Sequence, residues 1–479
     1  MTQHYPIMTC QTFNGLDKIN ITAPFDESLI ATAEVANAEV VESALTSAYK
    51  LYQDKPSWLS KSKRIEILNK TADIMQGQIE DLTLQAAREG GKPYIDSKVE
   101  VIRAIDSIRT CADSLRNNAG QEIPMGVNAA SEKHLAITTH EPIGVVVAVS
   151  AFNHPLNLIA HQAGPAIAAG CPVIIKPTQD TPISCFNLVN ILRQAGLPDA
   201  WCQVLLINDR DLATKLVSDS RVAFFSFIGS AKVGWMLRSK LSEGTRCALE
   251  HGGVAPAIIE ADANLDKTLP AIAKGGFYHA GQVCVSVQRV YCQKNIIDSV
   301  VSDLKTRASK LTVGDPTLEA TEIGPLIRPR EVDRVHDWVQ EALDEGAELI
   351  CGGEKLSSTC YAPTILLNPS SSSKVSTMEV FGPVICLYSY DNLDNAIKQA
   401  NALDVSFQAC IFTESIDSAM HAYKQLNGSA IMVNEHSAFR VDWMPFAGLN
   451  HSGLGIGGIW YTFHDMQVEK MLVIKSEYV

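Results

Sequence analysis

From residue 143 onward, short and continuously apolar runs alternate with longer segments of helical periodicity. The runs IGVVVAVS, CPVIIKP, CQVLLI and VAFFSFIG are each followed by a stretch expected to be helical, at 156–169, 184–194, 212–217 and 231–241. Continuous apolar runs rich in β-branched residues are typical of strands covered on both faces. Such strands alternating with helices predict βαβ units and a parallel sheet, whose ligands bind beyond the carboxyl ends of the strands.

A second alternation follows Glu250 and predicts another α/β unit of about 180 residues, an ordinary domain size. Its expected strands are APAIIE, QRVYCQ, PTILL, PVICLYSY, CIFT and SAIMVN, and its expected helices span 266–279, 331–345, 394–402 and 417–425. A chain of 479 residues that is 46% hydrophobic is long and apolar enough to bury the cores of two such units.

The regions outside this alternation are of a different kind. Residues 31–118 have helical periodicity, which predicts helices packed against a larger body. The polar, alternating stretch 117–139 predicts an extended excursion. The run MLVIK, within residues 466–479, predicts an edge strand with no obvious partner nearby, and an unpaired edge invites pairing.

The charge balance and the cysteines restrict the class of protein. The 53 acidic residues outnumber the 40 basic ones, and no segment has the Lys/Arg density that binding to nucleic acid requires. The 12 cysteines are scattered without any C-x-x-C, which is typical of a reducing compartment. The N-terminus lacks the pattern of a secretory signal, and the longest apolar run, 143–152, is far shorter than the roughly 20 residues of a membrane span. We therefore expect a cytoplasmic protein that acts on small molecules and binds neither nucleic acid nor membranes.

A literal G-x-G-x-x-G occurs at Gly453, Gly455 and Gly458. A dinucleotide-binding fingerprint must follow a buried strand, open a helix and precede an acidic residue by about 20 positions. This match instead follows the loop-like MPFAGLNHS near the end of the chain. A tightly turning loop is therefore the favoured interpretation.

The junction at Gly229 and Ser230, between the strand VAFFSFIG and a helix, is a better candidate for an anion site. A helix N-terminus exposes unpaired N–H groups and the positive end of the helix dipole, which can hold a pyrophosphate. Ser230 could equally be an ordinary N-cap. Spacing alone leaves both interpretations open.

Polar side chains interrupt apolar strand ends in four further segments. They are Asn153 in AFNHPLN, Lys176 and Gln179 in VIIKPTQDTP, Glu250 in LEHGG and Cys284 in HAGQVCVSVQR. Each has an ordinary explanation: a helix cap, a snorkelling lysine, a surface ion pair or a small buried thiol. Taken singly, none of them establishes a site.

Taken together, the motifs SAFNHP, KP-x-x-x-TP, FIGSAKVG, LEHGG, GQVC, MEVFGP and PFAGLNHSG resemble the NAD(P)-dependent aldehyde dehydrogenase superfamily in order and spacing. The resemblance implies an α/β, aldehyde dehydrogenase-like fold. It places a Rossmann-type cofactor domain at 1–119 and 141–249 and a catalytic α/β domain at 250–444. A β-arm at 120–140 and a tail at 460–479 would join a neighbouring subunit in a homodimer or homotetramer.

The resemblance assigns catalysis to three residues. Cys284 would attack the aldehyde carbon to form a thiohemiacetal, because thiolates are strong nucleophiles. The side-chain amide of Asn153 and the backbone N–H of Cys284 would stabilise the developing oxyanion. After hydride transfer, Glu250 would activate the water that hydrolyses the resulting thioester. The resemblance implies no metal.

The implied cofactor is NAD or NADP. Lys176 would hold the adenosine ribose, and the helix N-terminus at Gly229 and Ser230 would hold the pyrophosphate. Glu379 and Phe381, in MEVFGP, would position the nicotinamide ribose and ring.

Gln179 departs from the pattern of many NAD-preferring members, which carry glutamate at this position. A carboxylate there would repel a 2′-phosphate, and glutamine removes that repulsion, so NADP is permitted but not required. Two other departures, SFQ at 406–408 and PFAG in place of PFGG, lie in loops near the expected substrate tunnel and predict no particular specificity.

Individual residues in and beside the motifs indicate the class of substrate. AFNHPLN and HAGQVC are most similar to a subgroup that acts on lactaldehyde, glyceraldehyde 3-phosphate and phosphonoacetaldehyde. Members that handle phosphate or phosphonate tend to carry Arg immediately before the nucleophile, where this chain has Val283. We therefore expect a small oxygenated aldehyde, such as lactaldehyde or a semialdehyde. Arg103, Arg109 and His154 are candidate contacts to its carboxylate or hydroxyl, although surface charges and a helix-start histidine are equally ordinary explanations.

Other activities stay open at this point. They are a CoA-acylating (semi)aldehyde dehydrogenase, a phosphorylated or phosphonate aldehyde dehydrogenase, and a non-catalytic protein that keeps the same fold. CoA-acylating members often lack the glutamate that Glu250 supplies here, so its presence favours hydrolysis. The intact set of Cys284, Glu250 and Asn153 argues against a non-catalytic role.

Overall fold

Two mainly parallel sheets organise the computed structural model, which describes residues 3–479. The first sheet has six strands in the spatial order β20 (Gly453–Leu454), β10 (Arg246–Glu250), β9 (Val222–Ile228), β6 (Val145–Val149), β7 (Val173–Lys176) and β8 (Cys202–Val204). Neighbouring strands are parallel except β20, which runs antiparallel to β10. The four strands predicted from the apolar runs are confirmed, and β10 is a strand that those runs did not predict.

Helices cover both faces of this sheet. They are α1 (Ala38–Gln53), α2 (Lys61–Gln76), α3 (Ile79–Gly90), α4 (Tyr94–Arg116), α5 (Asn157–Ala169), α6 (Ile183–Gln194), α7 (Arg210–Ser218), α8 (Ala231–Arg238) and α15 (Ile459–Asp465), with 3-10 turns η1 (Lys55–Ser57) and η2 (Asp199–Trp201). Because side chains alternate along a strand, Val146 and Ala148 pack towards α2, α4, α5, α6 and α15. Val145 and Val147 pack towards α1 and α7 on the other face. This double covering explains why the strands are continuously apolar.

The second sheet has seven strands. Their spatial order is β13 (Glu348–Cys351), β14 (Thr364–Leu367), β15 (Val384–Tyr390), β12 (Val287–Gln293), β11 (Ala255–Ile259), β17 (Gln408–Phe412) and β18 (Ala430–Val433). Neighbours are parallel except the pair β13–β14. The accompanying helices are α9 (Leu265–Phe277), α10 (Ile297–Ala308), α11 (Pro329–Asp344), α12 (Lys374–Thr377), α13 (Leu393–Ala400) and α14 (Ile416–Gln425). Helices α9, α10 and α11 pack on one face and α13 and α14 on the other.

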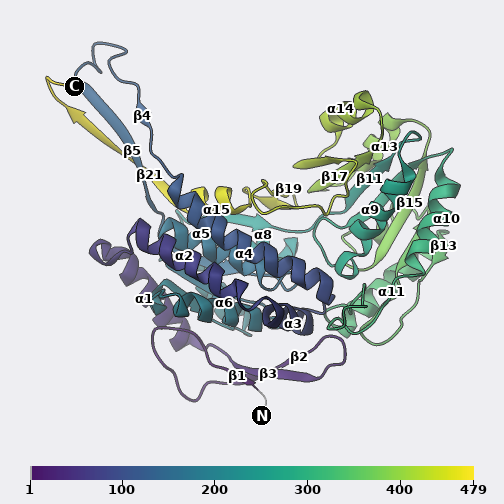
Figure 1. Ribbon diagram of the computed structural model, residues 1–479, viewed down its shortest axis with the longest axis horizontal. Coiled ribbons are helices and arrows are strands. Elements are labelled where there is room, and N and C mark those ends of the chain that lie inside the picture. Colours follow the sequence, from purple (N-terminus) through teal and green to yellow (C-terminus); the bar gives the residue numbers. More distant parts are fainter. Residues whose placement is uncertain (1–2) are drawn as a thin grey trace.

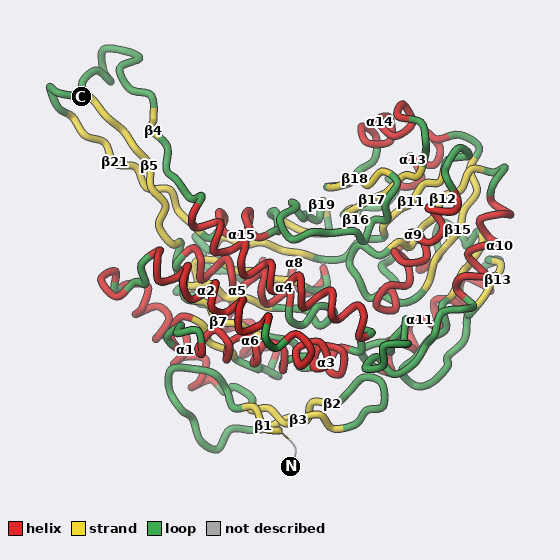
Figure 2. The backbone as a smooth tube through the Cα atoms, viewed as in Figure 1, coloured by secondary structure: helices red, strands yellow, loops and turns green. Residues whose placement is uncertain are grey.

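Figure 1 shows the two sheet units side by side, with the chain passing from the first to the second and returning at its end. A short ladder of β16 (Val405–Ser406) and β19 (Leu449–Asn450) lies on the return path, as Figure 2 shows. The α/β class predicted from the sequence is confirmed.

Two expectations about helices are wrong in detail. The helical region begins at residue 38 rather than 31, because β3 (Leu29–Glu34) pairs with β1 (Gln3–Tyr5) and β2 (Lys18–Thr22) in a small separate sheet. The helix expected to reach residue 279 ends at 277, because the backbone then turns into the left-handed region.

The arm is a three-stranded sheet of β4 (Glu122–Ile123), β5 (His134–Pro142) and β21 (Gln467–Lys475), and it projects from the body of the molecule (Figure 1). The expectation that MLVIK has no nearby partner is wrong. It lies in β21, which pairs antiparallel with β5 from residue 467 opposite 142 to residue 475 opposite 134. These segments are more than three hundred residues apart, so local sequence could not reveal the pairing.

The tail also begins later than the predicted residue 460. Ile459, Phe463 and Met466 of the α15 region are buried in the core of the first unit. The extended tail therefore starts at Gln467, where β21 begins.

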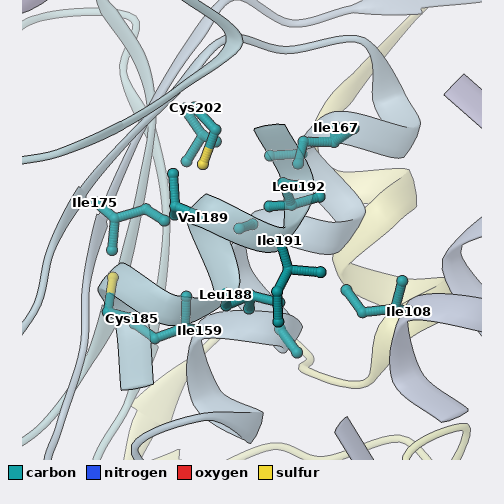
Figure 3. Packing of buried hydrophobic residues seen from close by; sticks show 14 of the residues in the cluster. Ile108, Ile159, Ile167, Ile175, Cys185, Leu188, Val189, Ile191, Leu192 and Cys202 are labelled. Atoms are coloured by element: carbon teal, nitrogen blue, oxygen red, sulfur yellow. The ribbon is translucent and has the colours of Figure 1, made fainter. Parts of the chain in front are cut away.

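All twelve cysteines are free, and most of them are buried. Figure 3 shows two of these, Cys185 and Cys202, packed among isoleucine, valine and leucine side chains of the first core. Cys10 is exposed, whereas Cys247, Cys284 and Cys351 are half-buried. Within residues 3–479, no helix combines the length and the apolar character needed to cross a membrane.

Candidate active site

A cavity of about 1100 Å³ is lined by residues of both sheet units. One wall consists of residues at or just after the carboxyl ends of β6, β7, β9 and β10, which is where a parallel sheet binds its ligands. The other wall comes from the second unit, at 282–285, 378–379, 381, 436 and 438–440. The predicted site residues that line the cavity are Arg103, Asn153, His154, Lys176, Gln179, Gly229, Ser230, Glu250, Cys284, Glu379 and Phe381.

The backbone that leads to Cys284 is held in an unusual conformation. In η3 (Tyr278–Gly281), His279 has φ 50° and Ala280 has φ 53°, and Gly281 continues the left-handed turn at φ 70°. A non-glycine residue in this region costs about 1–3 kcal/mol and persists only where surrounding contacts hold it. Such strain is typical of functional sites, and here it directs the chain back towards the cavity.

Gln282 supplies the contacts that hold this turn. Its side chain is almost fully buried, accepts a hydrogen bond from the Ile327 N–H at 3.0 Å and donates to the Pro325 carbonyl at 3.1 Å. Its own backbone carbonyl accepts from Asn153 Nδ2 at 2.9 Å. Because that amide nitrogen carries two hydrogens, one N–H of Asn153 stays available to a bound group.

Cys284 and Glu250 face each other across the cavity, with 4.0 Å between Sγ and Oε1. Burial raises the pKa of Glu250 to about 7, and the positive charge of Arg440 opposes this rise. Burial, followed by the carboxylates of Glu250 and Glu379, raises the pKa of the Cys284 thiol well above its usual value. The thiol therefore rests protonated beside a carboxylate whose pKa suits a general base near neutral pH.

Arg440 is a cavity residue that the motifs did not identify. Its guanidinium carbon lies 3.7 Å from the ring centre of Phe446, and its Nη1 has no hydrogen-bond partner within residues 3–479. Burial lowers the pKa of Arg440 to about 10, and the carboxylate of Glu250 opposes this shift. Buried donors are nearly always paired, so this free N–H can donate to an anionic group in the cavity. Its segment, SAFRVDW, belongs to none of the motifs and gave no signal.

Arg103 also lines the cavity, but it is already paired. Its Nε and Nη2 donate to the two carboxylate oxygens of Asp442 at 3.0 and 2.7 Å. Asp442 is also bonded to His161 Nε2 at 2.7 Å and to Asn157 Nδ2 at 3.2 Å. Although burial acts to raise the pKa of Asp442, the bonds from His161 and Arg103 hold it well below its usual value. Asp442 therefore stays negatively charged, and its charge neutralises that of Arg103.

His154 lies in the cavity with Nε2 3.5 Å from the Tyr278 hydroxyl. Burial, assisted by the positive charges of Lys92 and Arg103, lowers the pKa of His154 well below its usual value. His154 is therefore neutral at physiological pH and can contact a hydroxyl but adds no charge to the site.

Arg109, the other arginine predicted to contact the substrate, does not line this cavity. Its side chain is 43% exposed and lies 3.4 Å from Asp73, outside the cavity. Arg109 follows Arg103 by six residues on α4, and six residues turn a helix by about 600°, which leaves the two side chains roughly 120° apart. Only one of them can face the same cavity.

The residues expected to bind the cofactor also line the cavity. Lys176 ends β7 and donates to the Pro177 carbonyl at 3.3 Å, while Gln179 donates its Nε2 to the Ile207 carbonyl at 3.4 Å. Ser230 stands at the N-cap position of α8, but its side chain makes no capping hydrogen bond. An ordinary N-cap serine accepts a hydrogen bond from the first turn of its helix, and Ser230 accepts none. The N–H groups at the start of α8, in the cavity wall, are therefore available to an anion.

Glu379 and Phe381 stand at the reaction end of this part. Glu379 Oε1 is buried without a hydrogen-bond partner within residues 3–479, and burial raises the pKa of Glu379 to about 8. Phe381 has φ 46° and meets the Phe152 ring edge-on, with 5.7 Å between the ring centres. An orphaned carboxylate oxygen, an open helix N-terminus and a half-buried lysine fit the ribose hydroxyls and phosphates of a dinucleotide.

The glycines of the G-x-G-x-x-G match do not line the cavity. Gly453 begins the short edge strand β20, and Gly455 and Gly458 have φ of 82° and 103°. They form tight turns, in agreement with the prediction.

Comparisons with known proteins agree with this geometry. A model of the aldehyde dehydrogenase family matches residues 12–472. The 3-sulfolactaldehyde dehydrogenase of Priestia aryabhattai is 36% identical over 458 residues, covering 96% of this chain and 95% of that protein.

Solved structures of the same family are also similar. Aldehyde dehydrogenase 21 of Physcomitrella patens, in complex with the reaction product succinate, matches with a TM-score of 0.95 at 30% identity over 99% of both chains. A glyceraldehyde-3-phosphate dehydrogenase of Methanocaldococcus jannaschii, complexed with NADP, matches with a TM-score of 0.92 at 31% identity over 97% of this chain and 100% of that chain. The resemblance and the fold predicted from the motifs are confirmed.

Proposed function

This chain belongs to the aldehyde dehydrogenase family, and from this premise we propose that its substrate is a small oxygenated aldehyde with one negative charge remote from the carbonyl. The reaction class is that of the family, an oxidation of an aldehyde with NAD or NADP as cofactor. The observation that carries the proposal on the substrate is the buried, unpartnered Nη1 of Arg440 in the cavity wall.

The charges at the reaction end favour a monoanion. Arg103 and Arg440 contribute two positive charges, and Asp442 cancels one of them through its bonds to Arg103. The raised pKa of Glu250, about 7, and of Glu379, about 8, keep much of their negative charge off the site near neutral pH. A sulfonate or carboxylate matches a surplus of one positive charge, whereas a phosphate ester carries about −1.5 to −2 at pH 7 and would leave charge uncompensated in a buried place.

Two further observations support this substrate class. Val283, immediately before the nucleophile, supplies no guanidinium for a phosphate. The similar proteins include one named for 3-sulfolactaldehyde, which is a sulfonate, and one whose structure contains succinate, which is a carboxylate. Lactaldehyde, an oxygenated aldehyde without charge, is expected to react but with lower kcat/KM.

In the proposed mechanism, Glu250 first takes the proton of the Cys284 thiol across the observed 4.0 Å. The thiolate attacks the aldehyde carbon, forming a C–S bond and a negatively charged oxygen. The free N–H of Asn153 and the backbone N–H of Cys284 stabilise that oxygen. The hydrogen bonds of Gln282 hold the Asn153 side chain and the loop that carries Cys284 in position for this step.

Bound NAD or NADP supplies the hydride acceptor, so that the thiohemiacetal on Cys284 becomes a thioester. Glu250 releases the thiol proton to solvent and, once deprotonated, removes a proton from water, which attacks the thioester carbon. The C–S bond breaks, the acid leaves, and the thiolate of Cys284 takes the proton that Glu250 removed from water. Glu250 must be deprotonated for both of its roles, and a pKa near 7 allows it to alternate between its two forms.

We assign the cofactor to the first unit, with domain limits 1–119 and 141–249, and the nucleophile to the second, 250–444. Lys176 would hold the adenosine ribose, and Gly229 and Ser230 the pyrophosphate at the N-terminus of α8. Glu379 and Phe381 would hold the nicotinamide ribose and ring. His154 and Arg103 stay proposed substrate contacts, now joined by Arg440.

A panel of aldehydes tests the substrate class. Initial rates are measured with 3-sulfolactaldehyde, succinic semialdehyde, lactaldehyde and glyceraldehyde 3-phosphate, each with NAD and NADP and without CoA. The expected order of kcat/KM is sulfonate or carboxylate first, then lactaldehyde, then the phosphate. A kcat/KM for glyceraldehyde 3-phosphate above that for both monoanions would contradict the charge argument.

The same assay tests the CoA-acylating alternative. Free carboxylic acid formed in stoichiometric amounts without CoA supports hydrolysis through Glu250. Product formation that depends on added CoA would establish acyl transfer to CoA instead.

We also propose that the arm joins a second copy of this chain, to give a homodimer or homotetramer. Met471, Leu472, Val473 and Ile474 of β21 are 41–57% exposed, and β21 forms an open edge of the arm sheet. An exposed apolar edge strand invites pairing. Light scattering after size exclusion should show an oligomer that the double change Leu472→Lys and Ile474→Lys dissociates. We keep the cytoplasm as the proposed location, in line with the free cysteines.

A further inference from the structure

Lys92 and Glu100 form an ion pair that is fully enclosed by protein. Lys92 lies in the turn between α3 and α4, and Glu100 lies in α4. Neither side chain is exposed to solvent, and Nζ of Lys92 donates to Oε2 of Glu100. The desolvation of a buried ion pair is so unfavourable that replacing the pair with apolar side chains is often neutral or stabilising. Stability alone therefore does not explain this pair, and its contacts indicate a second role.

The other carboxylate oxygen of Glu100 holds the start of α5. Glu100 Oε1 accepts from the backbone N–H of Leu156 at 2.9 Å and from that of Asn157 at 3.0 Å. The first N–H groups of a helix have no partner within the helix, and a polar side chain at the N-cap position usually binds them. Leu156 occupies that position in α5, and its apolar side chain cannot do so. Glu100 thus caps a helix other than its own.

Asn153, the proposed oxyanion donor, stands three positions before the capped residue Leu156. Pro155 lies between them, and its ring fixes its own φ, so the short link has little freedom. At the other end, the side chain of Asn153 donates to the Gln282 carbonyl at 2.9 Å. Asn153 is therefore held at two points, with its backbone fixed through α5 and Glu100 and its amide fixed through Gln282.

The turn that carries Lys92 packs against the same segment that Gln282 binds. Gly91 has φ 71°, and a Cβ there would lie 2.9 Å from Cγ of Pro325, so the backbone of the turn lies close to that ring. The carbonyl of Pro325 accepts from Gln282 Nε2 at 3.1 Å. These contacts close a ring that includes the oxyanion donor. In order, its members are Asn153, Gln282, Pro325, the turn at Lys92, Glu100 and the start of α5.

The same cap also reaches the anion-binding side of the cavity. Asn157, whose N–H is bound by Glu100, donates its Nδ2 to Asp442 Oδ1 at 3.2 Å. Asp442 has two further partners, Arg103 and His161, which do not belong to the start of α5. A shift of the start of α5 should therefore disturb the oxyanion donor more than the anion-binding side.

We propose that Glu100 is a positioning residue for the oxyanion site: held by Lys92, it fixes the start of α5 and thereby the amide of Asn153. The inference rests on the proposed role of Asn153 as an oxyanion donor. Neither Glu100 nor Lys92 lines the cavity, so neither touches substrate or cofactor. Their effect on the reaction passes through the placement of Asn153.

Two double variants of the full-length protein isolate the acceptor oxygen. Lys92→Met with Glu100→Gln removes both charges and keeps an oxygen that can accept from α5, whereas Lys92→Met with Glu100→Met removes that oxygen as well. Rapid mixing, with saturating cofactor and the aldehyde that has the highest kcat/KM, measures the first formation of NAD(P)H. We expect this rate to be about tenfold or more lower in the methionine variant than in the glutamine variant, because its oxyanion donor is displaced. Equal rates would overturn the proposal.

The amplitude of the first phase counts folded active sites, so a loss of folded protein is not mistaken for a loss of rate. If the methionine variant does not fold, Glu100→Asp takes its place. Aspartate keeps the charge, but its carboxylate is one methylene shorter and cannot reach both Lys92 and α5. Its rate should be about tenfold or more below that of the wild type, and a wild-type rate would overturn the proposal.

A double-mutant cycle separates the positioning of Asn153 from a general loss of structure. The same two variants are compared again in the Asn153→Ala background. Because the donor is absent there, the change from glutamine to methionine at position 100 should lower the rate by less than about threefold. A loss as large as that measured with Asn153 present would show that the effect does not pass through this side chain, and would contradict the proposal.

Glu89 provides the matched control. It is also fully buried, and it caps α6 by accepting from the backbone N–H of Ile183 at 2.8 Å and of Ser184 at 2.7 Å, but it does not line the cavity. Glu89→Met should have a lower melting temperature than Glu89→Gln, while the two variants should form NAD(P)H at rates within about twofold. A loss of rate equal to that at position 100 would mean that any broken helix cap slows the reaction.

These outcomes distinguish the inference from the mechanism on which it rests. If Asn153→Ala alone forms NAD(P)H at the wild-type rate, the proposed oxyanion donor is wrong and the positioning role falls with it. If Asn153→Ala is slow and the change at position 100 slows it further by the full factor, the oxyanion donor stands and the positioning role is wrong.

Discussion

The two ends of the main cavity are built from the same kinds of side chain in opposite environments. At the reaction end, Cys284, Glu250 and Arg440 are half-buried, and desolvation is the largest cause of the pKa shift of each. At the adenosine end, Arg210 and Arg330 are exposed to solvent. Burial changes the pKa of a side chain and therefore its chemistry, whereas an exposed charge mainly attracts ligands of opposite charge.

This difference predicts where substitutions act. A buried charge interacts strongly because little water screens it, and an exposed charge interacts weakly and in a salt-dependent manner. Changes at the reaction end should therefore alter the rate by orders of magnitude. Changes at the adenosine end should alter the choice between cofactors and leave the chemistry intact.

The largest effect is expected for Cys284→Ala. Removing the proposed nucleophile should lower kcat by roughly 10⁴-fold or more, because the thiohemiacetal cannot form. Steady-state formation of NAD(P)H measures this. Cys247→Ala is the matched control, since Cys247 is also half-buried but lies in β10 away from the cavity. Activity within a few-fold of wild type in Cys284→Ala would remove that residue from the mechanism.

Glu250→Gln should affect the second half of the reaction most. Glutamine keeps the shape but cannot accept a proton, so turnover should fall by about 10²- to 10⁴-fold. Rapid mixing should then show at most one NAD(P)H per active site, followed by slow hydrolysis of the thioester. A linear time course at the wild-type rate would contradict the role of Glu250.

The pH dependence tests the same residue. Burial raises the pKa of Glu250 to about 7, and only its deprotonated form is a base. In the wild type, acid formation should therefore rise as the pH increases through about 7 and decline as it falls below. The corresponding inflection should be absent from the pH profile of Glu250→Gln. Its persistence in the variant would assign it to another group.

Arg440→Gln should have a smaller effect that depends on the substrate. Losing a charged hydrogen bond to the anionic group should lower kcat/KM for a sulfonate or carboxylate aldehyde by about 10- to 100-fold. The value for uncharged lactaldehyde should change less than threefold. Arg109→Gln, which removes an exposed arginine outside the cavity, should leave both substrates within twofold. An equal loss for charged and uncharged aldehydes would show that Arg440 is only structural.

The smallest effect is expected from salt. Because Arg210 is exposed, the dissociation constant of NADPH should rise several-fold between about 0.05 and 0.5 M salt. The KM of a monoanionic aldehyde, whose contacts are buried, should rise less. A stronger salt dependence for the aldehyde would reverse the contrast between the two ends of the cavity.

Much of the fold could be predicted because its signals are local. The apolar runs that became β6, β7, β9, β11 and β15 are continuous, since both faces of each sheet are covered by helices. Less regular elements were not predicted. The strand β10 is short and partly exposed, and β1, β2 and β3 form a small sheet near the N-terminus that has no long apolar run.

The candidate site was predictable in part for the same reason. Asn153, Lys176, Gly229 and Glu250 each lie at or just beyond the carboxyl end of a parallel strand, so the sheet brings them to one edge. Arg440 lies in none of these places. Arg440 lines the same cavity as Cys284, which is 156 positions earlier in the chain, only because of how the segment returning from the second unit packs.

The sequence by itself predicted the alternation of strands and helices in two α/β units and the candidate side chains of the site, because these depend on periodicity and short motifs. Tertiary structure decided which arginine of α4 faces the cavity, where the tail finds its partner, and how His279 and Ala280 turn the chain towards Cys284. Each of these depends on contacts between residues distant in sequence, whose geometry is set only when helices and sheets pack. The motifs can therefore be read from the sequence, whereas the arrangement of side chains around the cavity depends on packing.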